Sequence, residues 1–167
     1  MSVINETLKA NKAYAAKFKL GHLPMPPGRK LAVVACMDAR LTVEEVLGLK
    51  TGDAHIIRNA GGIVTEDVLR SLVISTHLLG TREYIIINHT DCGMLTFKDN
   101  ELTDKLVKQT GKTVVTPAVF HSFTKVEENV RRQIGKVKSH PWIPSSIPVR
   151  GFVFDVKTGK LKEVKLK

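Results

Sequence analysis

Aromatic residues and cysteines are scarce in this chain. Aromatics make up 5% of its 167 residues, and Cys36 and Cys92 are its two cysteines. The sequence has no run of about 18 apolar residues and no charged start that leads into a short apolar segment, so we expect neither membrane insertion nor secretion. We therefore expect a cytoplasmic protein whose cysteines are reduced, metal-bound or catalytic, because disulfides are rare in that compartment.

Acidic residues are also few beside the basic ones. The chain has 26 Lys and Arg against 16 Asp and Glu, which gives a formal net charge of +10. An excess of this size is typical of proteins that bind polyanions. However, the basic residues are spread along the chain, and no recognition motif with interleaved aromatics accompanies them. We expect a solvated basic surface and no specific nucleic-acid binding.

The hydrophobic content and the length of the chain fit one globular domain, which we expect to carry an N-terminal arm. Hydrophobic residues make up 43% of the chain, enough for one compact α/β core. We expect a single domain over residues 1–167, in which residues 1–30 form an arm. The arm would consist of a helix over residues 5–20 and a loop rich in proline and glycine. Because this helix has few apolar residues, we expect it to contact another subunit or to lie loosely on the core.

Strand-like and helix-like segments alternate through the middle of the chain. Segments that read as strands occupy residues 31–36, 54–59 and 83–88, of which the first is a continuous apolar run, with helical segments at residues 42–47 and 65–80 between them. This alternation predicts a mostly parallel central β-sheet flanked by helices. A helix over residues 123–138 and strands at residues 149–156 and 161–166 follow. Alternating lysines in the last strand predict a charged sheet edge.

The two cysteines follow equivalent ends of two predicted strands. Cys36 and Asp38 end the first strand, while His89 and Cys92 follow the third. Functional groups in an open parallel sheet collect beyond the carboxyl ends of the strands, so the fold can bring these residues together. Two thiolates and an imidazole suit Zn²⁺. Two arrangements remain open: a catalytic site with three ligands, and a closed structural site with Asp38 as the fourth ligand.

Arg40 favours the catalytic arrangement. It lies two residues after Asp38 and can hold that carboxylate in a bidentate pair. Such pairing would lower the pKa of the aspartate and keep it off the zinc, which leaves the fourth position to water. Asp38 could then accept the water's hydrogen. The alternative for Arg40 is an ordinary surface ion pair.

The segments CMDAR, RNAGG and HTDCG, in this order and at this spacing, resemble the β-class carbonic anhydrases, particularly their short, single-domain members. The resemblance is close from about Ala32 to Phe97. It implies that one zinc per subunit is held by Cys36, His89 and Cys92, and that Asp38 and Arg40 form the catalytic dyad. It further implies a carbonate dehydratase in which a zinc-bound hydroxide reversibly hydrates CO₂ to bicarbonate and a proton, in a homodimer or homotetramer.

Several other residues carry weaker expectations. Gly61 and Gly62 are expected to let the backbone approach the site closely, and Gly93 to do likewise. Arg58 either binds an anion or makes a structural ion pair, and Trp142 is expected to be a packing anchor. The other histidines are expected to be structural or to lie on the surface: His22, His55, His77, His121 and His140.

Two other functions remain open from the sequence. The same zinc hydroxide could hydrolyse carbonyl sulfide or carbon disulfide, which relatives of the short β-class type do. A catalytically silent zinc protein is the second alternative, although the presence of Asp38 and Arg40 argues against it. A redox protein with a Cys36–Cys92 disulfide would leave His89 unexplained.

Overall fold

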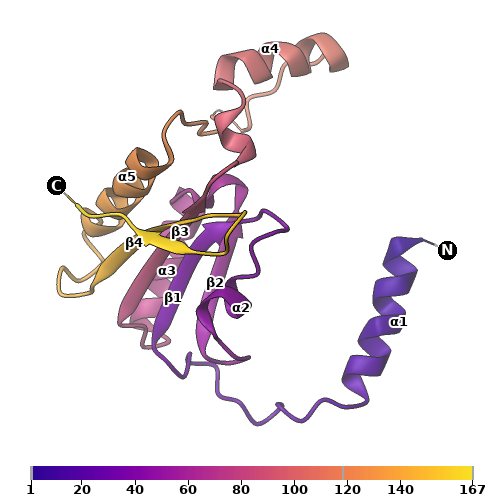
Figure 1. Ribbon diagram of the computed structural model, residues 1–167, viewed down its shortest axis with the longest axis vertical. Helices are drawn as coiled ribbons and strands as arrows, with labels where there is room; N and C mark the ends of the chain where they lie inside the picture. Colours follow the sequence, from indigo (N-terminus) through magenta and orange to yellow (C-terminus); the bar gives the residue numbers. More distant parts are fainter. Residues whose placement is uncertain (1, 118, 167) are drawn as a thin grey trace.

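A five-stranded sheet forms the centre of the computed structural model, which describes residues 2–117 and 119–166 (Figure 1). The strands lie in the order β2-β1-β3-β4-β5; β1 to β4 are mutually parallel and β5 pairs antiparallel with β4. The expected mostly parallel sheet is therefore confirmed, and the lysine-bearing last strand is an edge, as predicted. The strands are β1 Leu31–Cys36, β2 Ala54–Asn59, β3 Glu83–His89, β4 Val149–Phe154 and β5 Leu161–Glu163.

Both faces of the sheet are covered. Along β1, Ala32 and Val34 lie in one buried cluster, with residues of helices α3 Glu66–His77 and α5 Val126–Lys138. Val33 and Ala35 lie in a second cluster on the other face, which includes Val43 from the short helix α2 Val43–Leu47. Burial on two faces explains why β1 is a continuous apolar run rather than an alternating one.

The helices predicted beside the sheet are present, with small differences in their starts and caps. The Thr65 hydroxyl accepts a 3.4 Å hydrogen bond from the N–H of Val68 and caps α3, as expected for this residue type. Helix α2 occupies the predicted segment, but the Thr42 hydroxyl donates to the Glu45 carboxylate instead of capping the backbone. Helix α5 begins three residues later than predicted, at Val126.

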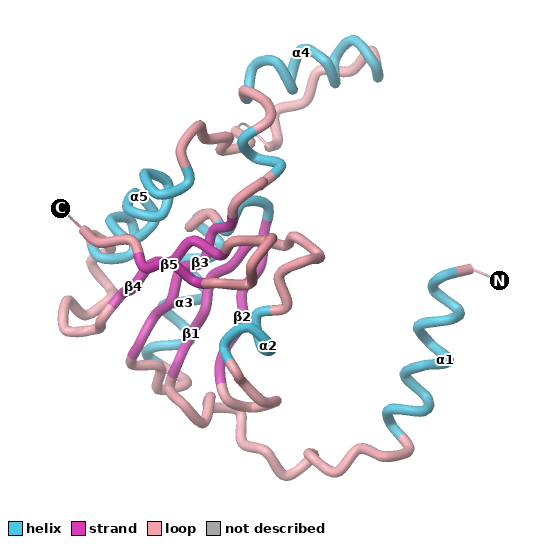
Figure 2. The backbone as a smooth tube through the Cα atoms, viewed as in Figure 1, coloured by secondary structure: helices cyan, strands magenta, loops and turns pink. Residues whose placement is uncertain are grey.

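Two helical segments project from the sheet and its covering helices (Figure 2). Neither α1 Val3–Ala15 nor α4 Asp99–Thr110 contains a buried residue. The predicted bounds of the first helix, 5–20, were wrong at both ends, because Ser2 caps it through a 3.3 Å hydrogen bond from the N–H of Asn5 and it stops at Ala15. Helix α4 was not predicted. Among the described residues, no helix has both the length and the apolar character needed to cross a bilayer.

In the proline-rich segment after α5, the expectation that Trp142 is a packing anchor was wrong. Trp142 is 70% exposed and is not a packing anchor. Its neighbours in the same loop, Ile143 and Ile147, are buried in the cluster under α3 and α5 instead. The turn that points Ile143 inward leaves Trp142 on the surface.

Candidate metal centre

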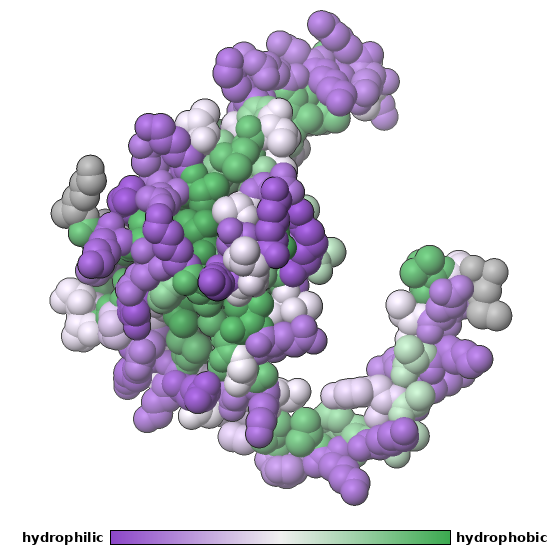
Figure 3. Space-filling view, viewed as in Figure 1, coloured by the Kyte–Doolittle hydropathy of each residue, from purple (hydrophilic) through white to green (hydrophobic). Residues whose placement is uncertain are grey.

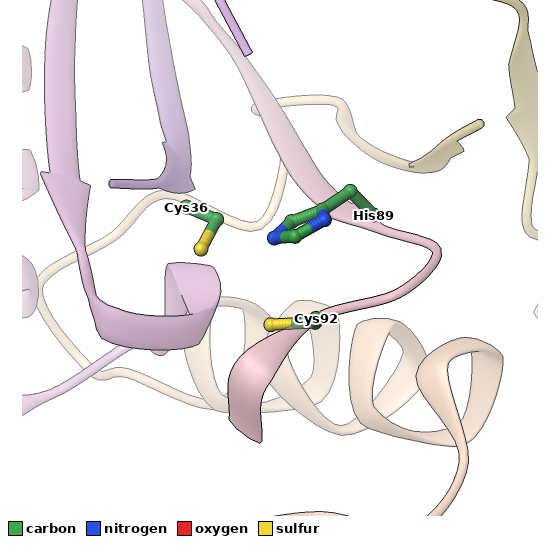
Figure 4. A group of neighbouring side chains, drawn as sticks. All are labelled: Cys36, His89 and Cys92. Atoms are coloured by element: carbon green, nitrogen blue, oxygen red, sulfur yellow. The ribbon is translucent and has the colours of Figure 1, made fainter. Parts of the chain in front are cut away.

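The carboxyl ends of β1 and β3 lie side by side, and the predicted site residues are found there. Cys36 is the last residue of β1 and His89 the last of β3, while Cys92 follows a short turn. Figure 4 shows the three side chains pointing toward one another. Their ligand atoms all lie within 4.8 Å of one another, and all three residues are buried. The parallel sheet thus brings together groups that are more than 50 positions apart, since β1 and β3 are adjacent strands.

His89 presents an unpartnered nitrogen to the two sulfurs. Its Nδ1–H donates a 2.8 Å hydrogen bond to the carbonyl of Thr90, which leaves Nε2 with its lone pair. Among the described residues, this Nε2 is the one buried side-chain nitrogen or oxygen without a hydrogen-bond partner. Such an atom typically costs about 1–3 kcal/mol. A cation facing the lone pair would remove that cost, so the imidazole fits a metal.

The two thiols behave as a pair. A side-chain hydrogen bond with Cys92 lowers the pKa of Cys36, and the same bond raises the pKa of Cys92. The pair therefore gives up one proton easily, because the first thiolate is stabilised by the second thiol and then opposes its ionisation. A divalent cation between the sulfurs would remove that opposition. Two sulfurs and one imidazole nitrogen are a donor set that suits Zn²⁺.

The turn after β2 brings backbone close to Cys36. The N–H of Gly61 donates to Cys36 Sγ at 3.3 Å. Gly61 and Gly62 have φ angles of 81° and 60°, and a Cβ on Gly62 would lie 2.9 Å from Asn88 Nδ2 and 3.0 Å from the backbone nitrogen of Cys36. Close approach therefore requires glycine here. The same expectation for Gly93 was wrong, because a Cβ on Gly93 meets nothing within 4 Å.

A chain of buried amides supports this turn. Asn88 Nδ2 donates to the carbonyl of Gly61 at 2.8 Å, and Asn88 Oδ1 accepts from Asn129 Nδ2 at 2.8 Å. Gln133 Nε2 donates to Asn129 Oδ1 at 2.7 Å, and its own Oε1 accepts from the N–H of Val64. Sequence reasoning missed this chain. Polar residues at i and i+4 on the buried face of α5 were the signal that could have revealed it.

Asp38 and Arg40 form the expected pair beside the three donor atoms. Arg40 Nε and Nη2 donate to Asp38 Oδ1 and Oδ2 at 2.9 and 2.8 Å, and the Arg40 backbone N–H also donates to Oδ1. The guanidinium holds the pKa of the Asp38 carboxyl well below its usual range. Asp38 Oδ2 lies 3.7 Å from His89 Nε2. An ionised carboxylate therefore borders the group of donors.

Arg58 has a structural role in the same loop. Its Nε donates to the carbonyl of Cys36 at 2.9 Å, and its Nη2 donates to the carbonyl of Asp38 at 2.7 Å. These bonds hold the backbone of the loop through carbonyl groups rather than through an ion pair, and anion binding by Arg58 stays a prediction.

The middle and C-terminal parts of the chain match a known family. Residues 31–161 match the family model described as carbonic anhydrase. Over 165 residues, the chain is 50% identical to beta-carbonic anhydrase 1 of Mycobacterium tuberculosis (strain ATCC 25618 / H37Rv), with 98% of this chain and 99% of that protein covered. The chain belongs to the β-carbonic anhydrase family.

Solved structures and more distant relatives of this β-carbonic anhydrase agree with that assignment. A carbonic anhydrase from Streptococcus mutans superposes with a TM-score of 0.93 at 46% identity, over 99% of each chain. A carbon disulfide hydrolase of Saccharolobus solfataricus is 35% identical, with 96% of this chain and 88% of that protein covered. The match to a protein named for carbon disulfide is thus weaker than the match to the mycobacterial protein.

Proposed function

We propose that this β-carbonic anhydrase reversibly hydrates CO₂ to bicarbonate and a proton, with Zn²⁺ held by Cys36, His89 and Cys92. The observation that carries the proposal is the convergence of these three donors beside an ion-paired Asp38, in a chain 50% identical to a β-carbonic anhydrase. When bound, Zn²⁺ supplies Lewis acidity that lowers the pKa of a coordinated water toward neutrality.

Asp38 accepts a hydrogen from the water in this proposal. Its carboxylate is kept ionised by Arg40, and its Oδ2 lies at the edge of the donor group, 3.7 Å from His89 Nε2. A hydrogen bond from water to Oδ2 orients the water oxygen's lone pair toward an incoming CO₂ carbon. Arg40 holds both carboxylate oxygens, which keeps Asp38 from turning inward to become a further ligand.

Hydrolysis of carbonyl sulfide or carbon disulfide at the same residues is the alternative. The 35% identity to a carbon disulfide hydrolase supports it, but less strongly than the 50% identity supports CO₂ hydration. Release of sulfide from either sulfur compound, without CO₂ hydration, would favour this alternative. A silent zinc protein would have no use for the Asp38–Arg40 pair.

We also propose that the protein acts as a homodimer or homotetramer in the cytoplasm. Figure 3 shows apolar surface along the N-terminal arm. A helix of 13 residues without buried contacts is only marginally stable by itself, so a second copy would provide the missing contacts. The free thiols of both cysteines fit a reducing compartment. The exposed apolar side chains of the arm are Val3, Ile4, Leu8, Tyr14, Phe18, Leu20, Leu23 and Met25.

Stopped-flow CO₂ hydration by the zinc-loaded protein tests the activity, and Asp38→Ala tests the mechanism. We expect Asp38→Ala to lower kcat/KM roughly 100-fold or more, because it removes the group that accepts the water's hydrogen. Zinc content should stay near one per chain, since none of the three proposed ligands is altered. Full activity in Asp38→Ala would rule out the dyad mechanism, and an inactive zinc-loaded parent would direct attention to carbonyl sulfide.

A further inference from the structure

Arg40 is held by two carboxylates rather than one. Beyond its bonds to Asp38, Arg40 Nη1 donates to Asp91 Oδ2 at 2.8 Å, and Nη2 donates to the Asp91 carbonyl at 3.0 Å. Asp91 lies in the turn between His89 and Cys92, whereas Arg40 follows Cys36. The guanidinium therefore joins the two loops that supply the three donor atoms.

The backbone of Asp91 is arranged for this contact. Its φ angle of 55° is in the left-handed region, which aspartate and asparagine tolerate better than most residues. In this conformation both the side chain and the carbonyl of Asp91 reach the same guanidinium. The side chain and the carbonyl of Asp91 both accept from Arg40, so the carboxylate acts on the site through that guanidinium.

Arg40 needs such an anchor because it is only half buried. Its side chain is 47% exposed, and an exposed Arg–Asp pair by itself is weakly held, since two side chains lose rotamer freedom to form it. Asp91 accepts hydrogen bonds from Nη1 and Nη2 of the guanidinium, while Asp38 accepts from Nε and Nη2. Because carboxylates hold the Arg40 guanidinium on two sides, its bidentate geometry toward Asp38 is preorganised.

We propose that Asp91 is a positioning residue for the reaction: it fixes the Arg40 guanidinium and thereby holds the Asp38 carboxylate at the edge of the donor group. This inference rests on the proposed function, in which Asp38 accepts the hydrogen of the water. Asp91 itself does not touch substrate. Its contribution is the orientation of Asp38, delivered through Arg40.

Two substitutions separate the Asp91 carboxylate from the Asp91 backbone. Asp91→Gly keeps the left-handed turn and the carbonyl acceptor but deletes the carboxylate. It should lower kcat/KM about tenfold, within the coupling range of contacting residues. Asp91→Asn keeps an oxygen that accepts from Nη1 and should restore the rate to within about threefold, since a neutral acceptor gives a weaker bond than a charged one.

A matched control removes a similar ion pair elsewhere. Asp67 pairs with Arg70 on α3, and its side chain is 72% exposed against 70% for Asp91. Asp67→Ala should stay within about twofold of the parent, because surface pairs of this kind contribute little. Zinc affinity, measured by chelator competition, should change by less than about tenfold in Asp91→Gly. A larger loss is typical when a residue that hydrogen-bonds directly to a metal ligand is removed.

The decisive measurement repeats Asp91→Gly in an Asp38→Ala background. If Asp91 acts by orienting Asp38, the second substitution causes no further loss. NMR of the Arg40 Nε–H should also show faster side-chain motion in Asp91→Gly than in the parent. A parent-like rate in Asp91→Gly, no rescue by Asp91→Asn, or a further loss in the Asp38→Ala background would each overturn the proposal. An inactive parent would instead overturn the proposed function, while the arginine spectrum would still report whether Asp91 fixes Arg40.

Discussion

The metal centre and the two projecting helices are built in opposite ways. At the centre, Cys36, His89 and Cys92 are almost fully buried, and the loops around them are tied by hydrogen bonds from Arg58, Gly61 and Arg40. Helices α1 and α4 have no buried residue. One copy of the chain therefore supplies a complete set of donor atoms, but it leaves the apolar side chains of its arm in solvent. The three donors thus come from one chain, whereas a helix as short and unburied as α1 needs further contacts for stability.

The largest effect should come from breaking the donor set. Cys92→Ser replaces a soft thiolate by a hydroxyl that remains protonated near neutral pH. Loss of a group that only hydrogen-bonds to a metal ligand lowers metal affinity by up to roughly 100-fold, so loss of a ligand itself should lower zinc affinity by more. Activity should fall with zinc occupancy. Elemental analysis and chelator competition measure both quantities. Ala13→Ser, on the exposed arm helix, is the control and should retain zinc. Stoichiometric, tightly bound zinc in Cys92→Ser would contradict the proposed ligand set.

Two glycines near the metal centre should differ in how much an added methyl group destabilises the fold. Gly62→Ala should destabilise the zinc-loaded protein by about 3 kcal/mol or more, because it combines a positive φ with clashes against backbone atoms. Those atoms are the Ile87 carbonyl and the Cys36 nitrogen, at 2.9 and 3.0 Å from the added Cβ. Gly93→Ala adds a Cβ in open space and should change the free energy of unfolding by less than about 0.5 kcal/mol. Urea unfolding at fixed zinc concentration measures both; equal stabilities would show that the turn after β2 can relax.

The difference between the two regions also explains which parts were predictable from sequence. Strands buried on both faces produce continuous apolar runs, so β1 and β3 could be located, and with them Cys36 and His89 at their ends. Helix α4 has only three apolar residues, Leu102, Leu106 and Val107, among many polar and charged ones, so its sequence resembles a polar loop.

The supporting partners of the site were harder to predict than its main residues. Asp38 and Arg40 are close in sequence, so their pairing follows from spacing alone. Asp91 lies 51 positions from Arg40, and Asn129 lies 41 positions from Asn88. No local pattern links residues at such separations; the fold creates these contacts, and their roles become visible only in three dimensions.

The smallest of these effects concerns the arm. Leu8 is 57% exposed on α1, on the same helical face as Ile4. If a second copy covers this face, Leu8→Asp should raise the dimer dissociation constant about 10- to 100-fold, since it removes the burial of one leucine side chain. Lys9→Asp, about 100° around the helix from Leu8 and off the face that Leu8 shares with Ile4, is the control. Analytical ultracentrifugation over a dilution series measures the constant and also distinguishes a homodimer from a homotetramer.

The same dilution series tests whether the centre depends on the arm. Because all three donors come from one chain, zinc should stay bound to Leu8→Asp at concentrations where the dimer has dissociated. Identical dissociation constants for Leu8→Asp and the parent would remove the arm from the interface. Zinc loss that follows dissociation would show that the second copy stabilises the loops around the donors, so that the two regions are energetically coupled although no described residue of α1 lies among the donors.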